Sequence, residues 1–440
     1  MRKLWSASKS QIANSNLANY EGYISQKYNQ KFKRNYKNLL SWSVKNSAKF
    51  WESIWDYSNV KGVKGAINLK KSKTFYKNHF LSDYKLNFAE NLLSKSDNSK
   101  AITFVSENGY KEKRSWKELN INSNKIISFL KSNKIKSGDR VAAYLPNIIE
   151  TVEYFIGTSA IGAIWSSCSP DFGVKGVIER FAQIKPRILV ITDRYYYNGK
   201  EINIIERLPE IVNKIKSIKK VVVLSYPGKK LTKFKKIKSI KYFYSKDIKN
   251  IKKTNHTFKK FSFNHPLAIL YSSGTTGKPK CICHRSGGVL LQHLKEHQLH
   301  CEIKPGDNIF YFTTCGWMMW NWLVSSLASK ASIFLFDGFP MYKKNDLLFR
   351  LVSREKVSLL GVSAKYIDSL KKLNLKIKNK INLKNLKVIC STGSPLSREG
   401  FEYVYNNVKK NVHLASISGG TDIVSCFVLG NIYQPVYSGE

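Results

Sequence analysis

The sequence has little acidic charge and little arginine. Its 440 residues contain 30 Asp and Glu against 74 Lys and Arg, and only 12 of the basic residues are Arg. A net charge of +44 would suit a protein that binds nucleic acid or a membrane surface. Proteins that read phosphates or bases favour the planar guanidinium of Arg, which is scarce here. Because Asn, Ile, Tyr and Phe are also abundant, A/T-rich codons explain the excess of Lys better. Neither a nucleic acid nor a membrane is expected as a partner.

The sequence also lacks a long apolar run and paired cysteines. The N-terminus becomes polar at once and has no apolar stretch of the kind that a signal peptide needs. The most apolar region, residues 141–168, contains Pro146, Glu150 and Glu153, which favours a core segment over a membrane span. The seven Cys are odd in number and include no C-x-x-C pair, as is typical of a reduced cytoplasmic protein.

What the sequence does contain is an alternating pattern of strands and helices. The hydrophobic fraction of 42% is enough for a large core. Strand candidates lie at residues 101–105, 138–144, 187–192, 221–224 and 268–271, and helix candidates begin at Ser115 and Ile149. This alternation predicts a layered α/β fold with mostly parallel sheets and flanking helices.

Two stretches differ from this pattern. Residues 1–95 suggest helix and irregular chain, with a first helix over residues 11–17, and we expect them to wrap on a main domain at residues 96–440. Residues 227–262 are rich in Lys and are interpreted as a solvated loop, with a basic recognition patch as the alternative.

The most informative motif follows the strand candidate that ends at Tyr271. It reads Ser272-Ser273-Gly274-Thr275-Thr276-Gly277-Lys278-Pro279-Lys280. Glycines let backbone N–H groups approach an anion closely, and four hydroxyls add donors. Lys278 and Lys280 supply charge that would offset a developing pyrophosphate. The spacing is not that of a Walker A loop, and no G-x-G-x-x-G fingerprint is present. A surface loop rich in Ser, Thr and Gly is the weaker alternative.

This loop resembles the signature of the adenylate-forming superfamily, which includes acyl-CoA synthetases, adenylation domains and luciferases. The resemblance implies the large N-terminal α/β domain of that fold. It also implies that residues 272–278 and Lys280 bind the β- and γ-phosphates of ATP while a carboxylate attacks the α-phosphate. Thr276 and Lys278 would take part in catalysis.

Two later segments extend the resemblance. In Ser418-Gly419-Gly420-Thr421-Asp422, the glycines would contact ATP, Thr421 would act at the α-phosphate, and Asp422 would help to hold Mg²⁺. Ser418 departs from the aromatic residue often found there, so adenine stacking is not assigned to it. Gly393, Ser394 and Pro395 resemble the segment that lines the adenosine pocket. A plain turn is the alternative for either segment.

Longer stretches point to one subfamily. Residues 86–93, 166–173, 290–297 and 310–322 are more similar to acetoacetate–CoA ligases than to acetate or propionate ligases. The resemblance implies a cytoplasmic enzyme of lipid or energy metabolism that converts acetoacetate, ATP and CoA into acetoacetyl-CoA, AMP and pyrophosphate through an acyl-adenylate. Gly316 and Trp317 would line the acyl pocket.

Residues His293, Glu296 and His297 form an H-x-x-E-H motif, the spacing of an inverted zinc-protease motif. No third ligand is evident, and we interpret them as polar helix residues.

Members of the superfamily continue beyond the position that Glu440 matches, with a ribose-binding Asp, a hinge and a small mobile domain that bears the adenylation lysine. We therefore expect a C-terminally truncated chain that lacks this domain, from an incomplete gene, a frameshifted or split gene, or a truncated record. A separately encoded C-terminal domain is a candidate partner. The alternatives are a non-catalytic ATP-binding fragment, half of a split synthetase, or a ligase for another short-chain acid.

Overall fold

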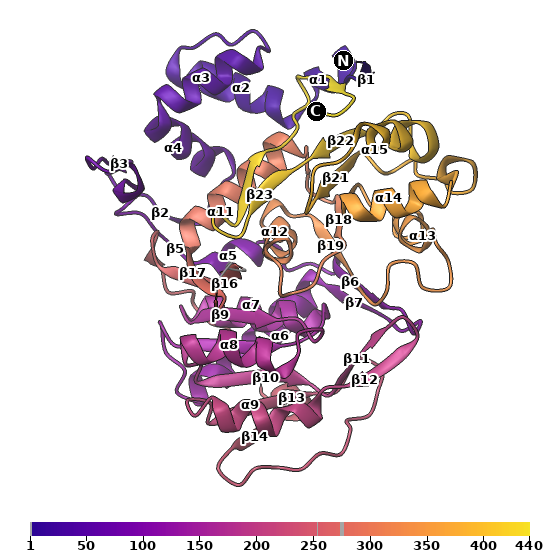
Figure 1. The fold of residues 1–440 in the computed structure, drawn as a ribbon. Helices are drawn as coiled ribbons and strands as arrows, with labels where there is room; N and C mark the ends of the chain where they lie inside the picture. Colours follow the sequence, from indigo (N-terminus) through magenta and orange to yellow (C-terminus); the bar gives the residue numbers. More distant parts are fainter. Residues whose placement is uncertain (1, 253, 273–276) are drawn as a thin grey trace.

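A seven-stranded sheet forms the lower half of the molecule in Figure 1. The structure, a computed structural model, describes residues 2–252, 254–272 and 277–440. The strand order of this first sheet is β14-β13-β10-β8-β9-β16-β17. Its strands are β8 (Arg140–Tyr144), β9 (Ile164–Cys168), β10 (Ile188–Thr192), β13 (Lys220–Leu224), β14 (Lys241–Tyr244), β16 (Pro266–Ser272) and β17 (Lys280–Arg285).

A second seven-stranded sheet lies above the first, with the order β22-β21-β20-β18-β19-β6-β7 (Figure 1). Its strands are β6 (Lys100–Ser106), β7 (Lys111–Ser115), β18 (Asn308–Tyr311), β19 (Ser332–Asp337), β20 (Leu359–Ser363), β21 (Val388–Thr392) and β22 (His413–Ser416). In each sheet only the last strand, β17 or β7, runs antiparallel to its neighbour. The other neighbours are parallel, which confirms the expected α/β fold.

Both sheets contribute one face to a shared apolar core. In β10, Ile188 and Val190 belong to this core, whereas Leu189 and Ile191 join a separate cluster on the outer face, as the two-residue period of a strand requires. The shared core also receives helices α5 (Phe88–Leu92), α6 (Trp116–Ser132), α7 (Ile149–Ala160), α11 (Ser286–Lys295) and α12 (Met318–Ser325).

Further helices cover the two outer faces. Helices α8 (Val174–Ile184) and α9 (Leu208–Lys214) cover the first sheet. Helices α13 (Leu347–Arg354), α14 (Ala364–Lys372) and α15 (Arg398–Tyr403) cover the second sheet. None of the helices in the described residues has the length and hydrophobicity that crossing a bilayer requires.

The strand and helix predictions are largely confirmed. The five expected strands are β6, β8, β10, β13 and β16, and the two expected helices are α6 and α7. Helix α6 begins with the capping box that Ser115 and Glu118 predict. The remaining short strand pairs are β2 (Gly62–Val63) and β15 (Phe261–Ser262) with β5 (Lys85–Leu86), β3 (Leu69–Lys70) with β4 (His79–Phe80), β11 (Arg194–Tyr197) with β12 (Lys200–Asn203), and β23 (Ser418–Gly420) with β24 (Ser425–Val428).

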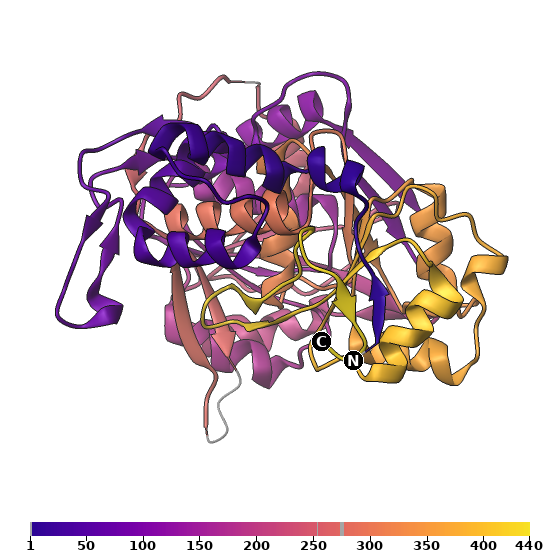
Figure 2. The ribbon, with the colours of Figure 1, turned by 90° about the horizontal axis from the view of Figure 1, so that it is seen from above.

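The prediction of one helix over residues 11–17 is wrong. The structure has two helices there, because the hydroxyl of Ser15 accepts a hydrogen bond from the N–H of Ala18 at 3.0 Å and starts a new helix. The helices of this region are α1 (Lys9–Ala13), α2 (Asn16–Tyr28), α3 (Tyr36–Lys45) and α4 (Ser47–Tyr57). Strand β1 (Lys3–Trp5) pairs with β25 (Val436–Tyr437), so the two ends of the chain lie side by side (Figures 1 and 2).

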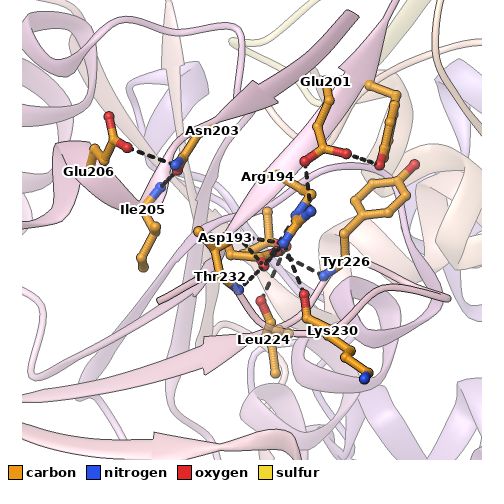
Figure 3. A network of polar contacts seen from close by, with 12 residues as sticks. Asp193, Arg194, Glu201, Asn203, Ile205, Glu206, Leu224, Tyr226, Lys230 and Thr232 are labelled. Carbon is orange, nitrogen blue, oxygen red and sulfur yellow. Dashed lines mark hydrogen bonds and ion pairs between the residues drawn. The ribbon is translucent and has the colours of Figure 1, made fainter. Parts of the chain in front are cut away.

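The interpretation of residues 227–262 as one solvated loop is also wrong in part. Strand β14 and helix α10 (Ser245–Lys249) fall within it, because β14 completes the parallel edge of the first sheet beside β13. The chain before β14 is anchored by the buried carboxylate of Asp193 (Figure 3). This carboxylate accepts hydrogen bonds from the N–H of Tyr226 at 2.9 Å, the N–H of Thr232 at 2.9 Å and the Arg194 guanidinium at 3.0 Å.

Candidate active site

The candidate site lies where parallel strands of the second sheet end. The segments after β18, β20, β21 and β22 leave the same edge of this sheet, the edge at which α/β proteins bind ligands. Backbone hydrogen bonds join these segments. The N–H of Ile417 donates to the carbonyl of Ser391 at 2.7 Å, and the N–H of Phe312 donates to the carbonyl of Gly361 at 2.9 Å. A methyl group on Gly393 would lie 4.0 Å from the Ser363 side chain.

The phosphate loop closes the antiparallel hairpin of β16 and β17. Ser272 and Lys280 face each other in the strand register, and Gly277 has a φ of +122°, in the region that favours glycine. Lys278 and Lys280 are exposed. The predicted ligands Ser273, Gly274, Thr275 and Thr276 lie outside the described residues.

One side of this hairpin is anchored by a strand of the first sheet and the other by a helix that covers this sheet. The hydroxyl of Ser166 in β9 donates to the Tyr271 hydroxyl at 2.9 Å. The side-chain amide of Gln183 in α8 donates to the carbonyl of Pro279 at 2.9 Å. The two ends of the phosphate loop are therefore held by different elements.

The second predicted nucleotide segment forms the hairpin of β23 and β24. Gly419 and Gly420 belong to β23, and a Cβ atom at Gly419 would come within 2.2 Å of the Ser425 carbonyl. Half-buried Thr421 and exposed Asp422 lie in the turn.

His284 connects this turn with the phosphate hairpin. Burial lowers the pKa of His284 in β17 to about 4, against the opposing effect of the Thr421 backbone and Asp422 beside it. The strand that leaves the phosphate loop thus runs next to the Thr421–Asp422 turn.

The predicted adenosine segment follows β21. Gly393, Ser394 and Pro395 are all exposed, and Gly393 has a φ of +87°. The hydroxyl of Thr392 donates to the carbonyl of Ile417 at 3.4 Å. The structure therefore brings this segment beside the chain that leads into β23.

The predicted acyl pocket lies in the turn between β18 and α12. A Cβ atom at Gly316 would lie 3.0 Å from the Phe172 ring and 3.1 Å from the N atom of Ser169, so the turn contacts the segment that follows β9. The hydroxyl of Ser167 donates to the Cys315 carbonyl at 2.6 Å and fixes the same turn. Trp317 is 61% exposed, at the start of α12.

Asn147 is a site-forming residue that the sequence analysis missed. Its side-chain amide donates to the carbonyls of Thr313 at 3.3 Å and Phe336 at 3.4 Å, and its oxygen accepts from the Trp320 indole at 3.0 Å. It ties the chain after β8 to the start of the acyl-pocket turn. The feature of the sequence that could have indicated Asn147 is that it is the only amide side chain within the apolar residues 141–168.

The H-x-x-E-H residues are buried in the structure. The His293 ring lies within hydrogen-bonding distance of the Ser325 hydroxyl at 2.9 Å and the Val424 carbonyl at 2.6 Å, so both its nitrogens are engaged. Within the described ranges, no three His, Cys, Asp or Glu side chains are grouped so that they could hold a metal ion.

Known proteins share this architecture. A family model described as AMP-binding enzyme matches residues 91–434. The acetoacetyl-coenzyme A synthetase of Rhizobium meliloti is 40% identical over 444 residues, covering 100% of this chain and 67% of that protein. The acetoacetyl-CoA synthetase of Gallus gallus is 42% identical over 414 residues, covering 92% of this chain and 62% of that protein.

A solved structure of an acetoacetyl-CoA synthetase has a similar fold. The acetoacetyl-CoA synthetase from Streptomyces lividans matches with a TM-score of 0.92 at 30% identity, over 100% of this chain and 68% of that one. The chain thus spans 62–68% of the length of these relatives. Family model, sequence identity and fold agree: the chain belongs to the AMP-binding enzyme family, and it is similar to acetoacetyl-CoA synthetases.

Proposed function

We propose that this chain carries the adenylating site of an ATP-dependent acetoacetate–CoA ligase. The observation that carries the proposal is the meeting of the phosphate hairpin with the Thr421–Asp422 turn: His284 of β17 lies beside this turn, and His293 of the following helix contacts the carbonyl of Val424. The relatives named acetoacetyl-CoA synthetases support acetoacetate as the acid. We further propose that residues 1–95 form a wrapping segment and residues 96–440 the adenylating domain.

The reaction needs an activated acid because a carboxylate is a poor electrophile. A carboxylate oxygen of acetoacetate attacks the α-phosphorus of ATP, and the bond to pyrophosphate breaks, which gives acetoacetyl-AMP. The thiol of CoA then attacks the acyl carbon, and AMP leaves with the bonding electrons. Both leaving groups are anions, so positive charge and hydrogen-bond donors around the phosphates lower the barrier.

The proposed roles follow from position and chemistry. Exposed Lys278 and Lys280, with Ser272 and Gly277 and the loop between them, would bind the β- and γ-phosphates. Thr421 would donate to the α-phosphate. Gly393, Ser394 and Pro395 would line the adenosine pocket, and Gly316 with Trp317 the acyl pocket.

Asp422 suits Mg²⁺ that is bound mainly through substrate. Mg²⁺ commonly takes one or two carboxylates and fills its other positions with phosphate oxygens and water. A single exposed carboxylate in a turn next to a threonine hydroxyl matches this donor set. Bound there, Mg²⁺ would neutralise charge on the pyrophosphate.

The test is acetoacetate-dependent pyrophosphate release by this chain with ATP and Mg²⁺. Acetate and propionate should be poorer substrates. Lys278→Ala should lower the rate by about 100-fold because it removes a charge that stabilises the leaving group. Lys372→Ala, an exposed lysine at the end of α14, is the control and should leave the rate unchanged. A stronger response to acetate than to acetoacetate would remove the assignment of the acid.

A chain that binds ATP without turnover would favour the alternatives of an ATP-binding fragment or half of a split ligase. The residues of the Rhizobium meliloti relative beyond the match, added as a separate polypeptide, would distinguish these two. Restored pyrophosphate release indicates a split ligase. No acetoacetate-dependent release even then would contradict the proposed activity.

A further inference from the structure

A fully buried carboxylate, Glu296, lies directly beneath the β23–β24 hairpin. It begins the π-helical turn Glu296–His300, which continues α11, the helix that leaves the phosphate hairpin. Its oxygens accept hydrogen bonds from the side chains of Trp322 at 2.8 Å and Gln292 at 2.8 Å, and from the Ser425 hydroxyl.

Cys426 completes the set of donors. Its N–H lies 3.4 Å and its Sγ 3.2 Å from the same carboxylate. Burial alone would raise the pKa of Glu296, but Lys295 and the β24 donors outweigh it and lower the pKa below its usual value. Glu296 is therefore an anion that joins α11, α12 and β24.

His293, one turn earlier in α11, contacts the same hairpin. A carbonyl only accepts, so the ring nitrogen Nε2 that faces the Val424 carbonyl must carry the proton. The direction of the hydrogen bond from His293 to Val424 is thereby fixed. Burial lowers the pKa of His293. Its Nδ1 lies 2.9 Å from the Ser325 hydroxyl, which itself donates to the Asn321 carbonyl at 2.8 Å.

The bond from His293 ends on a strained residue. Val424 is β-branched and buried, yet it has a φ of +48°, in the left-handed region. Its N–H donates to the carbonyl of Thr421 at 3.2 Å, which closes the turn that presents Thr421 and Asp422. A residue in such a strained backbone conformation keeps it only when several surrounding contacts hold it there.

We propose that His293 and Glu296 are positioning residues, which hold the β23–β24 turn so that Thr421 and Asp422 meet the same MgATP as the phosphate loop. The proposal rests on the proposed function, since it assigns this turn to ATP and Mg²⁺. It also explains the H-x-x-E-H spacing: residues three apart on one helical face reach Val424 and Ser425 of one hairpin.

The variants are His293→Ala, His293→Gln and Glu296→Gln, with His297→Phe as the matched control. His293→Ala removes the donor to Val424, whereas the amide of Gln can still donate to it. Glu296→Gln places an amide group among the donors that now surround an anion. His297 is equally buried on the same turn, but its ring nitrogens have no hydrogen-bond partner.

The measurements are the Kd of this 440-residue chain for ATP, with Mg²⁺ and with EDTA, and amide hydrogen exchange over residues 418–428. We expect His293→Ala and Glu296→Gln to weaken MgATP binding by about 10-fold or more, the effect typical of losing an outer-shell partner. Binding without metal should change less, because Asp422 acts through Mg²⁺. Exchange at the hairpin should speed up, while His293→Gln and His297→Phe stay near the wild type.

Ser425→Ala, which removes one donor to Glu296, is the milder variant if Glu296→Gln does not fold, and it should weaken MgATP binding in the same direction. Wild-type affinity in His293→Ala and Ser425→Ala, with unchanged exchange at the hairpin, would overturn the positioning role and leave the proposed function intact. Equal losses with Mg²⁺ and with EDTA would also overturn it, since they indicate general loosening. A wild-type chain that does not bind ATP would overturn the proposed function itself.

Discussion

Asn147, His293 and Glu296 are polar and buried, and each binds at least one group that is distant in sequence. The sequence predicts phosphate-loop residues because their chemistry is local: glycines, hydroxyls and lysines follow one another between residues 272 and 280. It does not predict Asn147, whose partners Thr313 and Trp320 lie more than 160 residues away. Such contacts depend on how the two sheets pack against each other. The spacing of residues along the chain does not predict this packing.

His297 gives a prediction for acid stability. Burial lowers the pKa of His297 from 6.5 to about 3. Between pH 6.5 and pH 3, the unfolded chain therefore binds a proton at His297 and the folded chain does not. Stability is therefore lost as the pH falls from 6.5 towards 3. At pH 5, this one histidine should make the free energy of unfolding about 2 kcal/mol smaller than at pH 7.5.

The variant His297→Phe keeps a ring against Trp322, whose centroid lies 4.2 Å away, and cannot take up a proton. The difference in unfolding free energy between pH 7.5 and pH 5, measured in urea, should shrink relative to the wild type. His79→Phe, at a half-buried position, serves as the comparison. An identical pH dependence in His297→Phe and the wild type would contradict the prediction.

Helices and strands were predictable where burial shapes the sequence. Strands β8, β10 and β13 are continuous apolar runs, because both faces of the first sheet are covered. Strand β14 was missed since it is an edge strand of partly exposed aromatic residues among many lysines. The break between α1 and α2 was also missed, although Ser15 provides a usual N-cap signal.

The segment anchored by Asp193 gives a prediction for this region of the chain. Asp193→Ala would leave the Arg194 guanidinium and the N–H groups of Tyr226 and Thr232 without their shared acceptor. We expect a loss of about 3 kcal/mol, the cost of breaking a buried charged pair. Residues 226–232 should also detach from β10, which frees the backbone at the exposed residues Lys229 and Lys230 for cleavage by trypsin.

Limited trypsin digestion followed by mass spectrometry checks this outcome. Asp247→Ala is the control, because Asp247 accepts from the N–H of Tyr244 at the start of α10 and does not contact Asp193. Cleavage after Lys229 and Lys230 should rise in Asp193→Ala alone. Equal cleavage in both variants would show that the Asp193 network does not hold this segment.

On the scale of the whole molecule, a contact joins the two ends of this chain. Trp5 is buried at the start of the chain, stacks on the ring of His413 with centroids 5.1 Å apart, and donates to the side chain of Asn411 at 3.0 Å. Trp5→Ala should lower the free energy of unfolding by about 3 kcal/mol.

Trp317→Ala deletes the same side chain where it is 61% exposed, and the free energy of unfolding should change by less than about 0.5 kcal/mol. Urea titrations of the two variants and the wild type test the pair. Similar losses in both would show that the closure at Trp5 contributes little. If Trp317 lines the acyl pocket, the effect of Trp317→Ala should be on substrate binding, with a higher KM for acetoacetate.

The pairing of β1 with β25 also sets an order of events during protein synthesis. Residues 3–5 are made before their partners at residues 436–437, which are added about 430 residues later. At about 5–20 residues per second, the first strand remains unpaired for on the order of 20 to 90 s. His413, on which Trp5 stacks, is also made long after Trp5. A strand of three residues that includes Lys3 is well suited to this interval, because short, charged edges resist pairing with other chains.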